Sequence, residues 1–422
     1  MHARTSFVTR LVGTAAIVGL LSTASAVMLG AAAPPIASNA VSTWSQTAQT
    51  VITAGRPPAS SEYLLALVHA AIYDAVVAIE GRYRPFRVRV EVDQPALPEA
   101  AVATAAYVVL RQRVPVAEPS LTATYVAYLA GLPGGPAKDR GVAVGTEVGA
   151  RWLALRADDR FDNAVTFQQP PPGPGIWEPT AATPPVDVKL ALVRPYVMGA
   201  AERFRPRGPR RLDSRAYARA VDEVYDVGRV DSLTRTPDQL AVAQFWSEHT
   251  AVQWNRNLRN LAASAELDLV DTARMLAMVH VAGADAVVGC FDAKYYFVFW
   301  RPVHAIQRAD TDDNPRTAQD LTWNALLNVN HPEYPSAHGC FTAAITDTLA
   351  YYFGTDEAEF ALDSAVTGTT RHYARFSEVT EEVQDARVWA GLHFGFSTSD
   401  GVKLGRQVAH LVTRRYFRPV ND

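Results

Sequence analysis

The stretch "LALVHAAIYDAVV" at residues 65–77 recurs as "LAMVHVAGADAVV" at residues 276–288. The two segments match at nine of thirteen positions without a gap, and the shared residues include one His and one Asp. Both segments are apolar on more than one face and contain no Pro, a pattern typical of helices that are buried on most sides. We therefore infer that the chain contains two related helical bundles that arose by duplication.

The polar residues of this repeat stand in the same register. His69 of the first copy corresponds to His280 of the second, and Asp74 corresponds to Asp285. Buried polar side chains are almost always hydrogen-bonded. We expect each His and its Asp to form buried hydrogen bonds between helices, rather than to bind a metal ion.

Helical periodicity dominates the rest of the chain as well. Strand-like alternation is confined to a short segment near residues 87–92. The sequence therefore predicts an all-α fold of helical bundles, in two related halves that each resemble a four-helix bundle. The predicted helices cover residues 61–79, 100–110, 121–132, 141–155, 213–227, 237–254, 268–290, 339–353, 380–394 and 401–417.

The N-terminus has the pattern of an export signal. Arg4 and Arg10 precede a long Ala-rich apolar run, and "ASA" at residues 24–26 offers a small-x-small cleavage site. We expect residues 1–33 to be a signal peptide and the protein to be secreted or extracytoplasmic. The run is long for a signal peptide, so an uncleaved membrane anchor is the alternative. After cleavage we expect no stable membrane insertion, because no later segment is judged long and apolar enough to span a bilayer.

The rest of the chain is expected to divide into two halves joined by the Pro-rich segment 168–185. Residues 34–230 would form a structural N-terminal half, and residues 231–422 a C-terminal half that carries the functional site. The net charge of −3 shows no basic excess, which argues against a nucleic-acid partner. The sequence leaves the oligomeric state open.

Two segments of the second half carry cations beside aromatic or small residues. "KYYFVFWRP", which begins at Lys294, places Arg301 seven residues later; on a continuous helix the two cations would lie two turns apart on one face. "ARVWAGLHFG", which begins at residue 386, places Arg387 and His393 six residues apart, in a helix that we expect to end between residues 391 and 395. Each segment alone is also compatible with an ordinary helix surface.

The third segment, "HPEYPSAHGC" at residues 331–340, combines a hydroxyl with free backbone amides. Ser336 stands where a helix N-cap is expected, and His338 lies in the first turn. Free N–H groups at a helix start bind anions. Together with the cations of the other two segments, this set suits a tetrahedral oxyanion with two or three charges. One His could bond to its central atom, while the other moves a proton.

The order K-x6-R-P, P-S-x-H and R-x5-H resembles that of the vanadium-dependent haloperoxidases and the type 2 phosphatidic acid phosphatases, which share one oxyanion site on a helical bundle. The resemblance covers residues 294–393, about a quarter of the chain. It implies vanadate as the cofactor, with His393 as its covalent ligand and His338 as the acid–base group. The groups that would hold the vanadate oxygens are Lys294, Arg301, Ser336, Arg387 and the backbone N–H of Ala337, a position where the family usually has Gly.

The resemblance implies a haloperoxidase that uses hydrogen peroxide to oxidise a halide, which then halogenates a small organic acceptor. His331 occupies a position where bromoperoxidases of the family carry a His, which favours bromide or iodide over chloride. One alternative is an exported acid phosphatase with a phosphorylated His393. The phosphatases usually carry an Asp where this chain has Ser397, which weakens that alternative. A second alternative is a helical protein that binds phosphate without catalysis.

The two Cys residues of the chain flank this expected site. Cys290 precedes Lys294 by four residues, and Cys340 follows His338 by two. If Lys294 and His338 share a site, the two Cys lie on neighbouring elements. Because disulfides persist in exported proteins, we predict a Cys290–Cys340 disulfide.

Overall fold

The computed structural model describes residues 39–420. The expected signal peptide, residues 1–33, lies outside the described residues. Contacts among the described residues join them into one compact unit, and the division into two halves at residue 230 remains a prediction.

The α-helices are α1 (Ala40–Thr53), α2 (Pro58–Glu80), α3 (Pro98–Arg113), α4 (Glu118–Ala130), α5 (Pro136–Leu155), α6 (Arg215–Gly228), α7 (Pro237–Phe245), α8 (Thr250–Ser264), α9 (Leu269–Phe297), α10 (Pro302–Gln307), α11 (Ala337–Phe353), α12 (Phe376–Trp389) and α13 (Gly395–Arg415). The short 3-10 helices are η1 (Pro115–Ala117), η2 (Val188–Leu192), η3 (Ala201–Phe204) and η4 (Ala309–Thr311).

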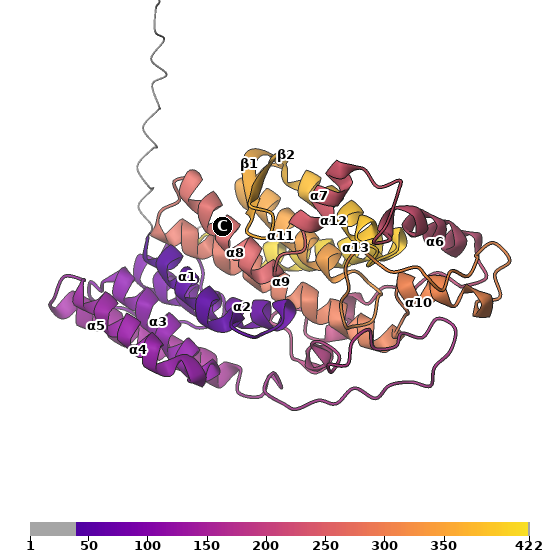
Figure 1. The fold of residues 1–422 in the computed structure, drawn as a ribbon. Helices are drawn as coiled ribbons and strands as arrows, with labels where there is room; N and C mark the ends of the chain where they lie inside the picture. The colour runs from indigo at the N-terminus through magenta and orange to yellow at the C-terminus, as the bar shows by residue number, and fades with distance from the viewer. Residues whose placement is uncertain (1–38, 421–422) are drawn as a thin grey trace, which may run out of the picture. The chain divides into compact units, whose positions relative to one another are not determined.

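The mostly helical fold is confirmed, and Figure 1 shows α1 to α5 on one side of α9 and α11 to α13 on the other. The repeat lies on α2 and α9, which pack against each other in the core. By length and composition both helices could cross a membrane, so the expectation that no later segment could do so is wrong. Their apolar residues are buried inside the protein, as in the core helices of globular proteins.

The two His of the repeat stack on each other across the α2–α9 interface. The rings of His69 and His280 lie with their centroids 4.4 Å apart and their planes at 6°. The two Asp do not bond to these His, so that expectation is wrong. Instead each Asp accepts backbone N–H groups from an extended segment: Asp74 from residues 86–88 and Asp285 from residues 196–198. The matched residues thus do the same work in both copies, which is what a duplication predicts.

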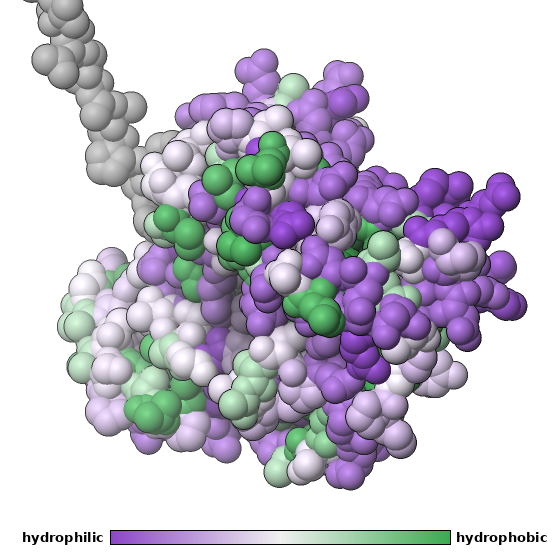
Figure 2. Space-filling view, turned by 45° about the vertical axis from the view of Figure 1, so that its right-hand side comes forward, coloured by the Kyte–Doolittle hydropathy of each residue, from purple (hydrophilic) through white to green (hydrophobic). Residues whose placement is uncertain are grey.

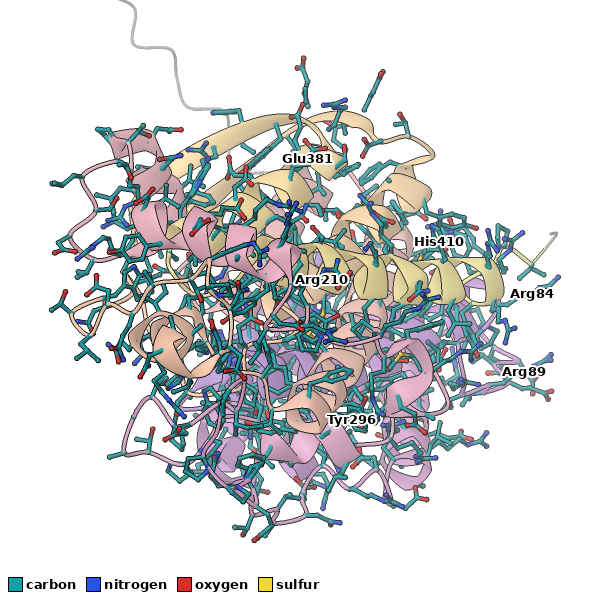
Figure 3. The ribbon with its side chains drawn as sticks, turned by 90° about the vertical axis from the view of Figure 1, so that its right-hand side faces the viewer. Arg84, Arg89, Arg210, Tyr296, Glu381 and His410 are labelled. Carbon is teal, nitrogen blue, oxygen red and sulfur yellow. A yellow bond between two sulfur atoms is a disulfide. The ribbon has the colours of Figure 1, made fainter. Side chains whose placement is uncertain are left out.

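The surface that covers this core is largely polar. In Figure 2 most residues on the visible face are hydrophilic, and the green apolar patches are separated by purple ones. Figure 3 shows Tyr296 at the outer side of the C-terminal end of α9. Its ring lies beneath the Arg205 guanidinium at 3.9 Å, and Arg205 is paired with Asp292 at 2.7 Å. Tyr296 therefore lies on the exposed side of α9, and Lys294, two residues earlier, lies on the opposite, buried side.

Several predicted boundaries need correction. The single helix expected at residues 237–254 is two helices, α7 and α8, separated by a turn at residues 246–249. The capping box of α7, between Thr236 and Gln239, confirms a helix start there. Residues 87–92 form no strand, because their backbone is held by the Asp74 carboxylate rather than by a neighbouring strand.

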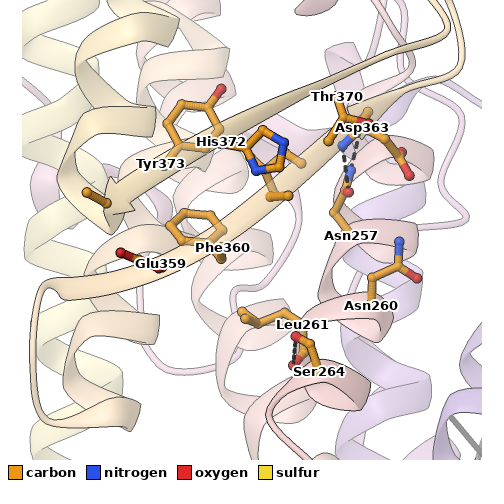
Figure 4. Close-up of a pocket in the computed structure, with 13 residues that line it drawn as sticks. Asn257, Asn260, Leu261, Ser264, Glu359, Phe360, Asp363, Thr370, His372 and Tyr373 are labelled. Atoms are coloured by element: carbon orange, nitrogen blue, oxygen red, sulfur yellow. Dashed lines mark hydrogen bonds between the residues drawn. The ribbon is translucent and has the colours of Figure 1, made fainter. Parts of the chain in front are cut away.

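The described residues also contain a β-hairpin that the sequence did not predict. Strands β1 (Glu357–Ser364) and β2 (Thr369–Arg375) pair antiparallel and lie over α8. The Asn257 side chain donates to the Asp363 carbonyl at 3.0 Å and accepts from the Asp363 N–H at 2.8 Å, which fastens the hairpin to α8 (Figure 4). The groove between them measures about 680 Å³ and is lined by none of the motif residues.

Candidate oxyanion site

Lys294 lies near the C-terminal end of α9 and is fully buried. Its ammonium donates to the carbonyl oxygens of Pro332 at 2.9 Å and Glu333 at 2.8 Å. Two backbone carbonyls hold the ammonium in place but do not neutralise it. The first motif therefore places an amine in the interior without a direct ion pair.

Lys294 and Arg301 do not share a continuous helix, and the helix predicted to end at residue 290 continues past Lys294. The helix ends at Phe297, and Val298 adopts a left-handed conformation with φ of 46°. The chain then runs extended, because the Val298 carbonyl accepts from Trp177 at 2.8 Å and the Phe299 carbonyl accepts from Glu333 at 2.9 Å. These bonds draw the segment between the Pro-rich loop and the third motif.

Arg301 joins all three motifs. It is the N-cap residue of α10 and is buried. Its Nε donates to the His331 carbonyl at 2.8 Å, one terminal nitrogen donates to the Leu392 carbonyl at 2.8 Å, and the other lies 3.1 Å from His331 Nδ1. The guanidinium therefore holds the segments before α11 and before α13 at fixed positions.

The start of α11 has the N-cap geometry that the sequence predicted. Ser336 is buried, and its hydroxyl accepts from the Gly339 N–H at 3.4 Å. The N–H of Ala337 belongs to the first turn and has no acceptor within the helix. His338 contacts Thr250, with 3.2 Å between Nε2 and the hydroxyl oxygen. The predicted hydroxyl, amide and imidazole thus lie at one helix end.

Arg387 and His393 come from two sides of a sharp turn. Helix α12 ends at Trp389, and Gly391 takes φ of 72°, so His393 lies in the connection before α13 rather than in a helix as predicted. One terminal nitrogen of Arg387 donates to the Trp246 carbonyl at 2.9 Å. Its Nε has no hydrogen-bond partner among residues 39–420.

Glu333 is a site residue that sequence reasoning missed. Its Oε1 lies 2.8 Å from His393 Nδ1 and accepts from the Phe394 N–H at 3.1 Å. Because Oε1 already accepts one N–H, the imidazole proton stays on Nδ1, and Nε2 keeps its lone pair for a ligand. Burial raises the pKa of Glu333 to about 7, while Lys294 and Arg301 act in the opposite direction.

The electrostatics of the site favour a bound anion. Burial and the neighbouring cations lower the pKa of Lys294 well below its usual range, and burial lowers the pKa of Arg301 to about 10 and that of Arg387 to about 9. The pKa of His393 is also lowered well below its usual range, mainly by burial and then by the charges of Arg301, Lys294 and Arg387. Buried charges are costly unless they are paired. An oxyanion with two or more charges is the group that would compensate these cations together.

The residues present fit vanadate. Arg387 Nε is an orphaned donor in the interior, the Ala337 N–H is free of an intrahelical partner, and His393 Nε2 is available as a ligand. Three cations, a hydroxyl and an amide match the oxygens of a tetrahedral or trigonal-bipyramidal oxyanion. Ala337 supplies the same backbone N–H as the Gly that is usual in the family, since α11 begins there in a right-handed conformation.

Comparisons with known proteins identify what this chain is similar to. Residues 274–422 match the VCPO second helical-bundle domain. A segment of 151 residues is 27% identical to the vanadium chloroperoxidase of Curvularia inaequalis, covering 29% of this chain and only 24% of that protein. A bacterial vanadium-dependent iodoperoxidase superposes with a TM-score of 0.78 at 21% identity, over 93% of this chain and 100% of that chain.

The chain therefore has the fold of the vanadium haloperoxidases, and residues 274–422 match one domain of that family. The structure of a holo-type bacterial vanadium-dependent chloroperoxidase is also similar, with a TM-score of 0.71 at 16% identity over 90% of this chain and 98% of that one. The family domain begins at residue 274 and contains all three motifs.

Beside the candidate site, the predicted disulfide is confirmed. Cys290 and Cys340 are bonded, with their Cα atoms 6.4 Å apart. The bond links α9 to α11, the helices whose ends carry Lys294 and Ser336. It therefore joins the two elements on which the site is built.

Proposed function

We propose that this protein is a vanadium-dependent haloperoxidase, with vanadate held at His393 Nε2. The observation that carries the proposal is the His393 imidazole, whose Nδ1 is fixed by Glu333 and whose electrostatic surroundings are three buried cations. When bound, vanadate supplies Lewis-acid activation of hydrogen peroxide at a constant oxidation state. Lys294, Arg301, Ser336, Arg387 and the Ala337 N–H would hold the vanadate oxygens.

His338 is the proposed proton carrier. Burial lowers its pKa well below the usual range, with Arg387 and Lys294 acting in the same direction, so the imidazole is neutral and can accept a proton from hydrogen peroxide at Nδ1 or Nε2. The Thr250 hydroxyl 3.2 Å from Nε2 fixes the orientation of the ring. Lys294, held by two carbonyls, keeps its ammonium at one position for the developing negative charge.

His331 is the proposed halide determinant. Its half-buried ring lies between Arg301 and Phe291, with 5.4 Å between the centroids of the His331 and Phe291 rings. Burial and the nearby Lys294 lower its pKa, so the ring is neutral and can donate one N–H. A large, weakly hydrated halide suits such a site, so we propose iodide or bromide over chloride. The similarity to an iodoperoxidase structure supports the proposal.

A phosphatase is the second candidate, and Glu333 favours it. A carboxylate on Nδ1 raises the nucleophilicity of His393 Nε2, which is the task of the Asp that phosphatases usually carry at the position of Ser397. Ser397 itself is buried beside Glu333 and acts to lower the pKa of that carboxyl. The loss of one carboxylate is thus offset by another from a distant segment.

Parallel assays separate the two candidates. The vanadate-loaded protein is tested with peroxide and iodide, bromide or chloride, and the vanadate-free protein with p-nitrophenyl phosphate. We expect halide oxidation in the order iodide, bromide, chloride, and its loss in His393→Ala. His410→Ala, on the outer side of α13 (Figure 3), is the matched control that keeps activity. Phosphate release without halide oxidation would instead support the phosphatase.

We also propose that the protein acts outside the cytoplasm, as its N-terminal sequence predicts. A site that uses peroxide and a halide needs no reducing cofactor, which suits an exported enzyme. N-terminal sequencing of the protein from culture medium tests this, with a start near residue 27 or 34 expected; an intact residue 1 in a cell-bound protein would contradict it.

A further inference from the structure

A cavity of about 270 Å³ opens beside the oxyanion site. Its floor is formed by His331, Ala337 and His338, which belong to the proposed catalytic residues. Its walls are apolar and come from the start of α2, from α9, from α11 and from the segment before His331: Pro57, Pro58, Ala59, Val287, Val329, Phe291 and Phe341. Cavities with this character usually bind small molecules of matching polarity.

One buried polar atom in this cavity has no partner. Glu62 lines the cavity and is 1% exposed. Its Oε1 lies 2.7 Å from His280 Nδ1, but its Oε2 has no hydrogen-bond partner within the described part of the chain. The other carboxylate at the cavity, Asp187, is occupied by the Ser60 N–H and hydroxyl. An unpaired buried oxygen is costly, and a ligand that pairs it would gain that free energy.

The space for this carboxyl group is built into α9. A Cβ on Gly283 would lie 2.6 Å from the Phe341 ring and 3.0 Å from Glu62 Oε1. The absence of a side chain at this one position lets the ring and the carboxyl group lie side by side. His280, stacked on His69, then holds the carboxyl group from behind.

We propose that this cavity binds the organic acceptor of the reaction, a one- or two-ring apolar molecule that carries an N–H or O–H group. The proposal rests on the proposed haloperoxidase function. The donor group of the acceptor pairs with Glu62 Oε2, and its ring lies between Phe291 and Phe341, with its far edge toward His331 and His338. The cavity volume of about 270 Å³ is several times the roughly 30 Å³ that one water molecule occupies in the liquid, so the cavity has room for such a ligand.

The chemistry of Glu62 requires a donor on the ligand. Burial raises the pKa of Glu62 and lowers that of His280 to about 3, so the pair is neutral. In a neutral pair, the protonated Oε1 donates a hydrogen bond to His280 Nδ1, and Oε2 remains an acceptor. An apolar ring without a donor would leave Oε2 unpaired and bind more weakly.

The test compares indole with N-methylindole, which is of similar polarity and shape but lacks the N–H. Binding to the full-length, vanadate-free protein is measured by ligand-observed NMR titration, so the result does not depend on catalysis. We expect indole to bind about 3- to 10-fold more tightly, the effect of one neutral hydrogen bond. Glu62→Leu should remove this difference by weakening indole alone, whereas Ala59→Leu, which narrows the cavity, should weaken both ligands.

Equal affinity of the two ligands for the wild-type protein, or failure of both to bind, would overturn the proposal without reference to any variant. A preference for indole that persists in Glu62→Leu would also overturn it. Iodide oxidation by the vanadate-loaded wild-type protein is measured separately, without an organic acceptor. If that oxidation is absent while the indole preference is found, the haloperoxidase proposal fails and the binding site stands.

Discussion

Removing one buried cation should stabilise the vanadate-free protein. Arg387 is 3% exposed, and burial followed by the repulsion of Arg301 lowers its pKa from 12.5 to about 9. Its hydrogen bond to the Trp246 carbonyl compensates little of this charge. We predict that Arg387→Met, which keeps a long flexible side chain without the charge, raises the melting temperature when no oxyanion is present.

The magnitude follows from two opposing contributions. The pKa shift to about 9 corresponds to an unfavourable free energy of roughly 5 kcal/mol, at about 1.4 kcal/mol per pKa unit, which is an upper limit. Loss of the hydrogen bond and less complete packing cost about 2–3 kcal/mol. The net gain is about 1–3 kcal/mol. With an unfolding entropy of about 2.1 cal/mol/K per residue, this raises the melting temperature of a chain of this size by roughly 1–4 °C.

Calorimetry at pH 7, in buffer free of vanadate and phosphate, measures this difference. Vanadate at about 100 times its Kd should then stabilise the wild-type protein by about 2.7 kcal/mol and the variant much less. Arg235→Met is the matched control, because Arg235 also donates to backbone carbonyls, those of Val227 and Arg229 at 2.8 Å, but lies outside the site. A loss of stability in Arg387→Met equal to that in the control would refute the reasoning.

Three further predictions concern pH, the His393 support and the disulfide. The vanadate-free wild-type protein should gain stability relative to Arg387→Met as the pH rises from 7 to 9.5. The reason is that the folded state releases the Arg387 proton near pH 9, while the unfolded state keeps it. An equal change of melting temperature with pH in the two proteins would contradict this. Glu333→Gln should weaken vanadate binding about 10- to 100-fold in titration calorimetry, and an unchanged affinity would exclude a positioning role. Replacing Cys290 and Cys340 by Ala, 50 residues apart, should lower the free energy of unfolding in urea by ~3–4 kcal/mol, and no loss would contradict the chain-entropy argument.

The motif residues could be predicted from the sequence, but their local backbone could not. Cations, a Ser N-cap and two His at fixed spacings indicated the anion site, and the structure brings them together. The helix predicted to end at residue 290 runs to Phe297, and Val298 then leaves it in a left-handed conformation, without a Gly to indicate it. What ends the helix is pairing with Trp177 and Glu333, residues far away in the chain.

Long-range contacts also explain the residues that were missed. Glu333 stands inside a motif, but its role depends on His393, 60 residues later. Glu62 faces His280 across 218 residues, and nothing beside it in the sequence indicates a partner. The sequence showed that the His and Asp of the repeat stand in register, but their hydrogen bonds were assigned wrongly. Each Asp carboxylate accepts backbone N–H groups and not a His.

The position of the disulfide explains how the site tolerates its own charges. After burial, the charges of Arg301 and Arg387 lower the pKa of Lys294, so in the absence of an anion the repulsion among these cations opposes the packing of the elements that carry them. The cross-link between Cys290 and Cys340 joins α9 to α11 and so holds the anion-binding start of α11, at Ser336, beside Lys294. Backbone carbonyls then fix the cations without neutralising them, which leaves their charge for the oxyanion. The covalent bond and the carbonyl contacts thus keep the site preorganised, at the cost of a less stable vanadate-free protein.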